Sequence, residues 1–252
     1  MTMPLIELQR VGFDYHDRRV LHELDFRLEP GERVALIGAN GAGKTTLLHL
    51  LVGLKRPSSG RILAFGRERT HERDFHEVRT RVGLLFQDSD DQLFCPTVLE
   101  DVAFGPLNLG RSPEQARTDA LETLDHLGLA DFAERITYRL SAGEKRLVAL
   151  ATVLAMHPEV LLLDEPTTGL DEATAERLIA HLEGLKQAMI LVSHDWAFLA
   201  RLATRAVRLV AGRLVEAILH SHTHAHRHDH LHPHSADELI GPHTDLEYQH
   251  PH

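Results

Sequence analysis

The chain has 252 residues, of which 43% are hydrophobic and 25% are charged, as is typical of a globular protein that folds without disulfides. Its net charge of −10 argues against a nucleic-acid-binding protein, because such proteins need clustered positive charge to displace counterions. The single cysteine, Cys95, excludes an internal disulfide. No apolar run approaches the roughly 18 residues that cross a bilayer, so we expect no membrane-spanning helix.

The first thirty residues alternate apolar and polar side chains, which predicts antiparallel strands. Buried strands that alternate with helices follow, and they predict a parallel sheet with helices on both faces. We expect strands at 31–38, 61–65, 82–86, 160–164 and 189–193, helices at 43–53, within 97–128, and at 141–156, 171–185 and 195–203, and two final strands at 205–218 about a turn at Gly212. The fold class is therefore α/β, with an antiparallel β subdomain and an inserted α-helical subdomain at about 88–155.

Histidine content divides the chain near residue 220. Eleven of the 20 histidines lie in residues 220–252, and this segment carries a net charge of −4, which leaves −6 for the rest. The segment has too few apolar residues to form a core. We therefore predict one domain over 1–219 and a His-rich, disordered tail over 220–252.

A glycine-rich segment, GANGAGKTT, follows the strand expected at 31–38 and opens the next helix. Gly38, Gly43, Lys44 and Thr45 stand at the offsets of a P-loop. The main-chain amides of such a loop and the helix N-terminus bind phosphate oxygens, while the lysine reaches the β- and γ-phosphates and the threonine hydroxyl binds Mg²⁺. We predict a nucleotide site made by Gly38, Ala39, Asn40, Gly41, Ala42, Gly43, Lys44, Thr45 and Thr46.

The apolar segment VLLLDEP (160–166) ends in two acids. Asp164 is expected to hold Mg²⁺ directly or through water, and Glu165 to polarise the attacking water. Taken alone, such a pair fits an ordinary strand end equally well. The P-loop earlier in the chain favours the catalytic interpretation.

Several further motifs stand in an order that resembles the ATP-binding cassette (ABC) family over about residues 4–218. LSAGEKR (140–146) resembles the signature motif and TTGLD (167–171) resembles the D-loop. Three single residues match the Q-loop glutamine, the switch histidine and the aromatic residue that stacks on adenine; these are Gln87, His194 and Tyr15. The resemblance implies a P-loop NTPase fold and ATP hydrolysis.

The resemblance also implies roles for individual residues. Lys44, Gln87, Glu165 and His194 would act in catalysis, and Gln87 would join Thr45 and Asp164 at Mg²⁺. Ser141 and Gly143 would contact the γ-phosphate held by the opposite subunit, and Asp171 would be the D-loop acid at the nucleotide. The family pairs two cassettes head to tail across ATP, so we expect a second ATPase subunit, most simply an identical chain.

The chain departs from the family pattern at three places. Ala142 replaces the usual glycine of the signature, and its β-carbon is expected to crowd the backbone near the phosphate. Glu144 stands where glutamine is commonest, and the D-loop carries an unusual pair of threonines. Because Ser141, the helix dipole and the D-loop acid remain, we predict a working site.

The stretch FQDSDDQLFCPTVLEDVAFGPLNLG (86–110) resembles ATPase subunits of energy-coupling-factor importers, particularly the cobalt and nickel group. In that family this region receives cytoplasmic coupling helices of a membrane subunit. The resemblance implies an integral-membrane coupling subunit and a substrate-binding membrane component as partners, and a peripheral location at the cytoplasmic face of the cell membrane. Asp88, Asp90 and Asp91 either face a basic partner segment or are simply solvated.

The tail segment HSHTHAHRHDHLHPH has a histidine at every second position. Neutral imidazole binds Ni²⁺, Co²⁺, Zn²⁺ and Cu²⁺, so we interpret the segment as a metal-scavenging tail. Its candidate ligands are His220, His222, His224, His226, His228, His230, His232 and His234. The tail does not identify the metal, because imidazole prefers copper and zinc; nickel or cobalt is implied by the resemblance of the body.

Three functions therefore stay open. The chain is an ATPase subunit that drives nickel or cobalt import, or the same subunit serving a vitamin or another substrate, or a soluble metal-storage or chaperone ATPase. The third function is disfavoured because soluble cassette ATPases commonly carry two cassettes in one chain, and this chain carries one.

Overall fold

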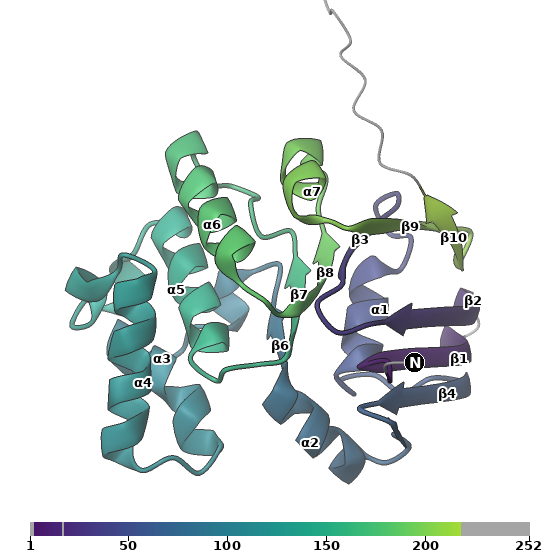
Figure 1. Ribbon diagram of the computed structural model, residues 1–252, viewed down its shortest axis with the longest axis horizontal. Coiled ribbons are helices and arrows are strands. Elements are labelled where there is room, and N and C mark those ends of the chain that lie inside the picture. Colours follow the sequence, from purple (N-terminus) through teal and green to yellow (C-terminus); the bar gives the residue numbers. More distant parts are fainter. Residues whose placement is uncertain (1–2, 17, 218–252) are drawn as a thin grey trace, which may run out of the picture. The chain divides into compact units, whose positions relative to one another are not determined.

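The computed structural model describes residues 3–16 and 18–217, which contain two sheets (Figure 1). The smaller sheet is antiparallel and has the strand order β2-β1-β4-β5. Its strands are β1 (Ile6–Tyr15), β2 (Arg18–Leu28), β4 (Ser59–Ala64) and the short β5 (Arg67–Glu68). This sheet is the antiparallel subdomain expected from the alternating pattern near the N-terminus.

The larger sheet has the order β10-β9-β3-β8-β7-β6, and all its pairings are parallel except that of the edge strand β10. Its strands are β3 (Arg33–Ile37), β6 (Val82–Leu85), β7 (Val160–Asp164), β8 (Ala188–Val192), β9 (Arg205–Val210) and β10 (Arg213–Ala217). The predicted α/β fold with a parallel core sheet is confirmed. Parallel strands end at the same edge, so the segments after β3, β6, β7 and β8 converge there.

Burial explains why the central strands are apolar except for Asp164 at the end of β7. Every residue of β7 and of β8 is buried, and along β7 successive side chains enter opposite sides of the core. Leu161 and Leu163 pack in the cluster formed with the helical subdomain, whereas Val160 and Leu162 pack with the antiparallel sheet and α1 (Lys44–Leu51). The sheet thus joins the two halves of the domain.

The segment between β6 and β7 is helical, and in Figure 1 it lies on the side of the core sheet away from the antiparallel sheet. It contains α3 (Val98–Asn108), α4 (Pro113–His126) and α5 (Ala142–Leu154), with short 3₁₀ turns at Ser89–Asp91, Ala130–Phe132 and Thr137–Arg139. Thr97, Ser112 and Ser141 are the N-caps of these three helices, and each belongs to a capping box. The expected N-cap at Ser112, with proline in the first turn, is confirmed.

Two elements were missing from the sequence prediction: β5 and the helix α2 (Glu72–Arg81). Phe75 and Val78 are the buried residues of α2 and the only apolar ones in its sequence ERDFHEVRTR, so its apolar face is too small to predict a helix. Its N-cap is His71, which is not a standard capping residue; Asp74 completes the turn by accepting the main-chain amide of His71 at 2.7 Å. The remaining helices, α6 (Glu172–Gly184) and α7 (Trp196–Leu202), lie within the expected ranges. Within residues 3–16 and 18–217, no helix has the length and apolarity needed to cross a membrane.

Candidate functional site

The glycine-rich loop connects β3 to α1, and its shape depends on Gly43. This residue has φ = +108°, and a β-carbon there would lie 2.9 Å from Val20 Cγ1, so only glycine fits without strain. Lys44 begins α1, and its Nζ donates to the carbonyl oxygens of Gly38 at 2.7 Å and Ala39 at 3.1 Å. The loop therefore surrounds an ammonium group, as a phosphate-binding loop requires.

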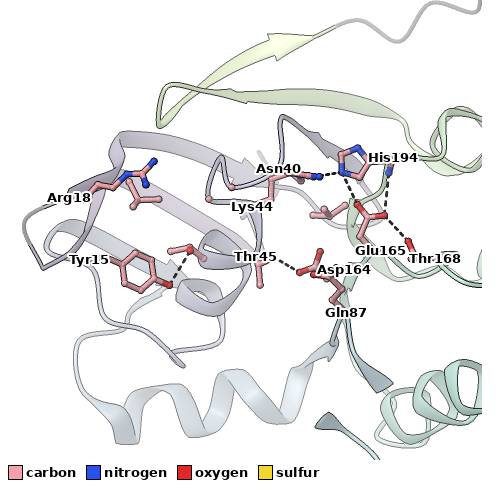
Figure 2. A pocket seen from close by; sticks show the side chains of 15 residues that line it. Tyr15, Arg18, Asn40, Lys44, Thr45, Gln87, Asp164, Glu165, Thr168 and His194 are labelled. Carbon is pink, nitrogen blue, oxygen red and sulfur yellow. Dashed lines mark hydrogen bonds and ion pairs between the residues drawn. The ribbon is translucent and has the colours of Figure 1, made fainter. Parts of the chain in front are cut away.

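The first turn of α1 meets the carboxyl end of β7. The Thr45 hydroxyl donates to Asp164 Oδ2 at 2.7 Å, and Gln87, two residues after β6, lines the same cavity. Hydroxyl, carboxylate and amide oxygens are the hard donors that Mg²⁺ prefers. These three side chains fit the predicted Mg²⁺ site, and Figure 2 shows Gln87 beside the Thr45–Asp164 pair.

Glu165 lies at the centre of a polar cluster (Figure 2). Its side chain is largely buried, and its backbone has φ = +51°, a conformation that non-glycine residues rarely adopt. Glu165 Oε1 lies 3.4 Å from His194 Nε2, and Oε2 accepts the Thr168 hydroxyl at 3.2 Å. His194 Nε2 also lies 2.8 Å from Asn40 Oδ1.

A cavity of about 800 Å³ extends to Tyr15, and the side chains described above line it: Asn40, Lys44, Thr45, Gln87, Asp164, Glu165, Thr168 and His194. The Tyr15 ring is 40% exposed, and its hydroxyl lies 3.3 Å from Thr46 Oγ1, a contact that lowers the pKa of Tyr15. Lys55 Nζ lies 4.8 Å from the ring centre. The volume is in the range of small-molecule ligand sites, so the cavity has room for a nucleotide.

Arg18, Val20 and Thr168 also line this cavity, and sequence reasoning did not assign them. Thr168 belongs to the threonine pair noted as unusual, which was a usable signal. Arg18 and Val20 lie on β2, where nothing in the sequence distinguishes them from ordinary strand residues.

The signature segment lines a different cavity, of about 390 Å³, together with Asp171. Ser141 accepts the Glu144 amide at 3.3 Å, and Glu144 accepts the Ser141 amide at 2.8 Å, which holds the pKa of Glu144 below its usual value. Glutamate at this position is therefore compatible with the helix start. Ser141, Gly143 and Asp171 are absent from the lining of the P-loop cavity within this chain.

Asp171 is the N-cap of α6. It accepts the Thr174 amide at 2.9 Å and the Thr174 hydroxyl at 2.7 Å, and these bonds lower the pKa of Asp171. The D-loop acid thus determines where α6 begins. Its predicted contact with a nucleotide remains a prediction.

Two of the three acidic residues after the Q-loop, Asp88 and Asp90, have partners inside the chain. Asp88 accepts the Asp90 amide at 2.9 Å, and the Asp90 carboxylate lies 2.6 Å from Lys145 Nζ. These two acids therefore stabilise the turn and its contact with α5.

The predicted transition-metal ligands of the tail, His220 to His234, lie outside the described residues. The described part of the chain contains no group of three or more histidine, cysteine or acidic side chains arranged to hold a metal ion.

The model of the ABC transporter family matches residues 21–168. An ABC transporter ATP-binding protein of Brucella suis biovar 1, whose name gives no substrate, is 56% identical over 87% of this chain and 92% of its own length. The cobalt import ATP-binding protein CbiO of Rhodobacter capsulatus is 48% identical over 78% of this chain and 72% of its own. The nickel import ATP-binding protein NikO of the same species is 45% identical over 85% of this chain and 89% of its own.

Two solved structures of related ATP-binding proteins are also similar to this chain. The structure of cbiO1 from Clostridium perfringens, part of the ABC transporter complex cbiONQ, has a TM-score of 0.76 and 31% identity over 84% of this chain and 87% of its own. A dimeric ATP-binding cassette in a post-hydrolysis state with ADP and phosphate has a TM-score of 0.77 and 27% identity over 86% of this chain and its full length.

Proposed function

We propose, from the premise that this chain belongs to the ABC transporter family and is an ATP-hydrolysing cassette, that it energises import of nickel or cobalt through an energy-coupling-factor transporter. The observation that supports the motor role is the convergence of Lys44, the Thr45–Asp164 pair and the Glu165–His194 pair on one cavity. The choice of cation is supported by the similarity to a cobalt and a nickel import protein.

Hydrolysis then follows from the positions of the side chains. Lys44 exchanges its loop carbonyls for phosphate oxygens when ATP enters, which neutralises part of the phosphate charge. Thr45, Asp164 and Gln87 would hold Mg²⁺, which supplies the remaining neutralisation. Glu165 accepts a proton from the attacking water, and His194, whose main-chain amide donates to Glu165 Oε2 at 3.4 Å and whose Nε2 lies 3.4 Å from Oε1, orients that carboxylate towards the γ-phosphate.

A second cassette completes the site in this proposal. Within one chain Ser141 and Gly143 line a cavity separate from the P-loop cavity, so they are available to a nucleotide held by another copy. Binding of ATP between two copies would close the dimer, and hydrolysis would release it. The similarity to a dimeric cassette supports this arrangement, and we propose a homodimer.

An exposed apolar patch, defined as Phe94, Phe104, Leu107 and Leu109, supports docking of a membrane subunit. Phe94 is 64% exposed and makes an edge-on contact with Phe104, with the ring centres 4.7 Å apart. Phe104 and Leu107 are three positions apart on α3 and therefore share a face of the helix, and exposed apolar patches mark interaction sites more often than isolated apolar residues do. We propose that this patch receives a cytoplasmic coupling helix, which places the chain at the cytoplasmic face of the cell membrane.

Copurification and uptake test the proposal. The chain should copurify with an integral-membrane coupling protein and a substrate-binding membrane component, and vesicles carrying the assembled complex should take up nickel or cobalt with ATP hydrolysis. Copurification without metal uptake would favour a vitamin or another substrate. Failure to bind any membrane protein would contradict the importer role and favour a soluble ATPase.

A further inference from the structure

Arg146 is a buried arginine on α5, five positions after Ser141, and its side chain has no role in the site described above. The residue is only 3% exposed. The five hydrogen bonds shown for its guanidinium all go to main-chain carbonyl oxygens: Gln87 at 3.1 Å, Asp164 at 2.8 Å, Pro166 at 3.2 Å, and shorter bonds to Phe86 and Glu165.

Burial of this charge needs an explanation. Desolvation of a guanidinium costs several kcal/mol before its partners compensate, and apolar replacements for buried charges are often no less stable. Burial indeed lowers the pKa of Arg146, while the negative charges of Asp164 and Glu165 oppose that shift. An apolar side chain could fill the space at position 146. Hydrogen bonds to the carbonyl groups of several separate segments require the guanidinium donors.

Arg146 is hydrogen-bonded to the two segments that carry the catalytic side chains, residues 86–87 and 164–166. Phe86 and Gln87 follow β6, whereas Asp164, Glu165 and Pro166 end β7 and begin the next loop. A guanidinium has five N–H donors in a rigid planar fork, and here they reach both segments at once. The Gln92 side chain also connects the segment after β6 to α5. It accepts a hydrogen bond from the Phe86 amide at 3.3 Å and donates one to the Ala149 carbonyl on α5 at 2.7 Å.

Arg146 is the last residue of the signature motif LSAGEKR, so its contacts also connect these segments to the start of α5. Ser141 caps α5, and a helix rises about 1.5 Å per residue, so Arg146 lies roughly 7.5 Å along the same rigid element. A shift of the signature must therefore move the guanidinium, and with it the main chain of Gln87 and of Glu165. A second cassette that contacts the signature motif would therefore change the positions of Gln87 and Glu165 through Arg146.

We propose that Arg146 is a positioning residue that couples the signature helix α5 to Gln87 and Glu165. The inference rests on the roles proposed above for those two residues. It predicts that loss of Arg146 slows hydrolysis without weakening nucleotide binding, because the P-loop contacts of Lys44 and Thr45 are left intact.

Arg146→Lys and Arg146→Met test the proposal in the full chain. Lysine keeps the charge with only three donors at one point, whereas methionine keeps an apolar volume without donors. Arg69→Lys is the matched control, because Arg69 is 6% exposed and also bonds main-chain carbonyls, those of Ala64 at 2.9 Å and Asp74 at 3.1 Å, outside the site. Thermal midpoint, affinity for a non-hydrolysable ATP analogue, kcat and KM are measured for each variant.

We expect both Arg146 variants to bind the analogue within about twofold of the unmodified chain and to lose about tenfold or more in kcat. Arg69→Lys should lose thermal stability but keep kcat within about twofold. A folded Arg146→Met with unchanged kcat would overturn the proposal, as would an equal loss of kcat in Arg69→Lys. Glu165→Gln is measured alongside; if it kept full activity, the proposed role of Glu165 would fail, whereas the Arg146 comparison would still report on coupling through Gln87.

Discussion

Thr45 and Asp164 are 119 residues apart in the chain, yet the Thr45 hydroxyl donates to Asp164 Oδ2 at 2.7 Å. The contact exists because the glycine-rich loop leads from the end of β3 into α1, and β7 ends at the same edge of the parallel sheet. It joins the start of α1 to the end of β7, the two segments that form the nucleotide site.

Replacement of Glu165 by glutamine should block hydrolysis while ATP binding persists. The amide keeps the size and the contact with His194 but cannot accept the proton of water, so kcat should fall by about 10²-fold or more. The variant should accumulate as a closed dimer with ATP, as measured by light scattering after size-exclusion chromatography. Hydrolysis at a near-normal rate would show that Glu165 is not the base.

Thr168 should position the Glu165 carboxylate through its hydroxyl, which donates to Oε2 at 3.2 Å. Thr168→Val removes the donor at nearly constant volume, and we expect kcat to fall by several-fold, about 1 kcal/mol, with the KM for ATP unchanged. Thr168→Ser keeps the donor and serves as the control, with kcat close to normal. Equal kcat values for the two variants would contradict the role of the hydroxyl.

Gly43→Ala should distort the phosphate-binding loop. The new methyl group would lie 2.9 Å from Val20 Cγ1 at a backbone φ of +108°, so we expect about 1–3 kcal/mol of lost stability and weaker ATP binding. Gly184→Ala is a matched control, because a β-carbon there meets no atom within 4 Å. The control should be neutral or slightly stabilising in chemical denaturation, while Gly43→Ala shifts the midpoint down.

The thiol of Cys95 should be unreactive at neutral pH. Burial, together with the negative charge of Asp101, raises the pKa of Cys95 to about 11. Only the thiolate reacts, so alkylation of the folded chain should be slow at pH 8 and should accelerate up to about pH 11. Because the folded-state value is raised, its contribution to stability is complete below the unfolded-state pKa of about 8.5 and is lost as pH rises towards 11. Unfolded chain at pH 8 is the control, and equal rates in the two states would refute the shift.

Truncation after Ile218 should separate the tail from the motor. We expect full ATPase activity, because every residue assigned to hydrolysis precedes this point, and loss of most bound nickel, because eleven of the 20 histidines are removed. Calorimetric titration of nickel into the full-length and truncated proteins measures the difference. Equal metal uptake by the two proteins would end the scavenging hypothesis.

Sequence alone determined the α/β order of elements and most of the ATP site. The P-loop is one contiguous segment whose glycine pattern directly encodes its backbone, and Asp164, Glu165, Gln87 and His194 stand at strand ends that parallel topology brings together. The helix α2 escaped prediction because only two of its ten residues are apolar, which is too few to define an amphipathic pattern.

Only the tertiary structure decided what Arg146 contacts and that the signature lines a cavity of its own. The partners of Arg146 are main-chain carbonyls, 60 positions away at Phe86 and 18 positions away at Asp164. Every residue has a main-chain carbonyl group, so the sequence does not show which of these groups will accept a hydrogen bond from Arg146. Contacts that depend on such groups follow from how the chain packs, whereas side-chain motifs can be recognised before the chain is folded.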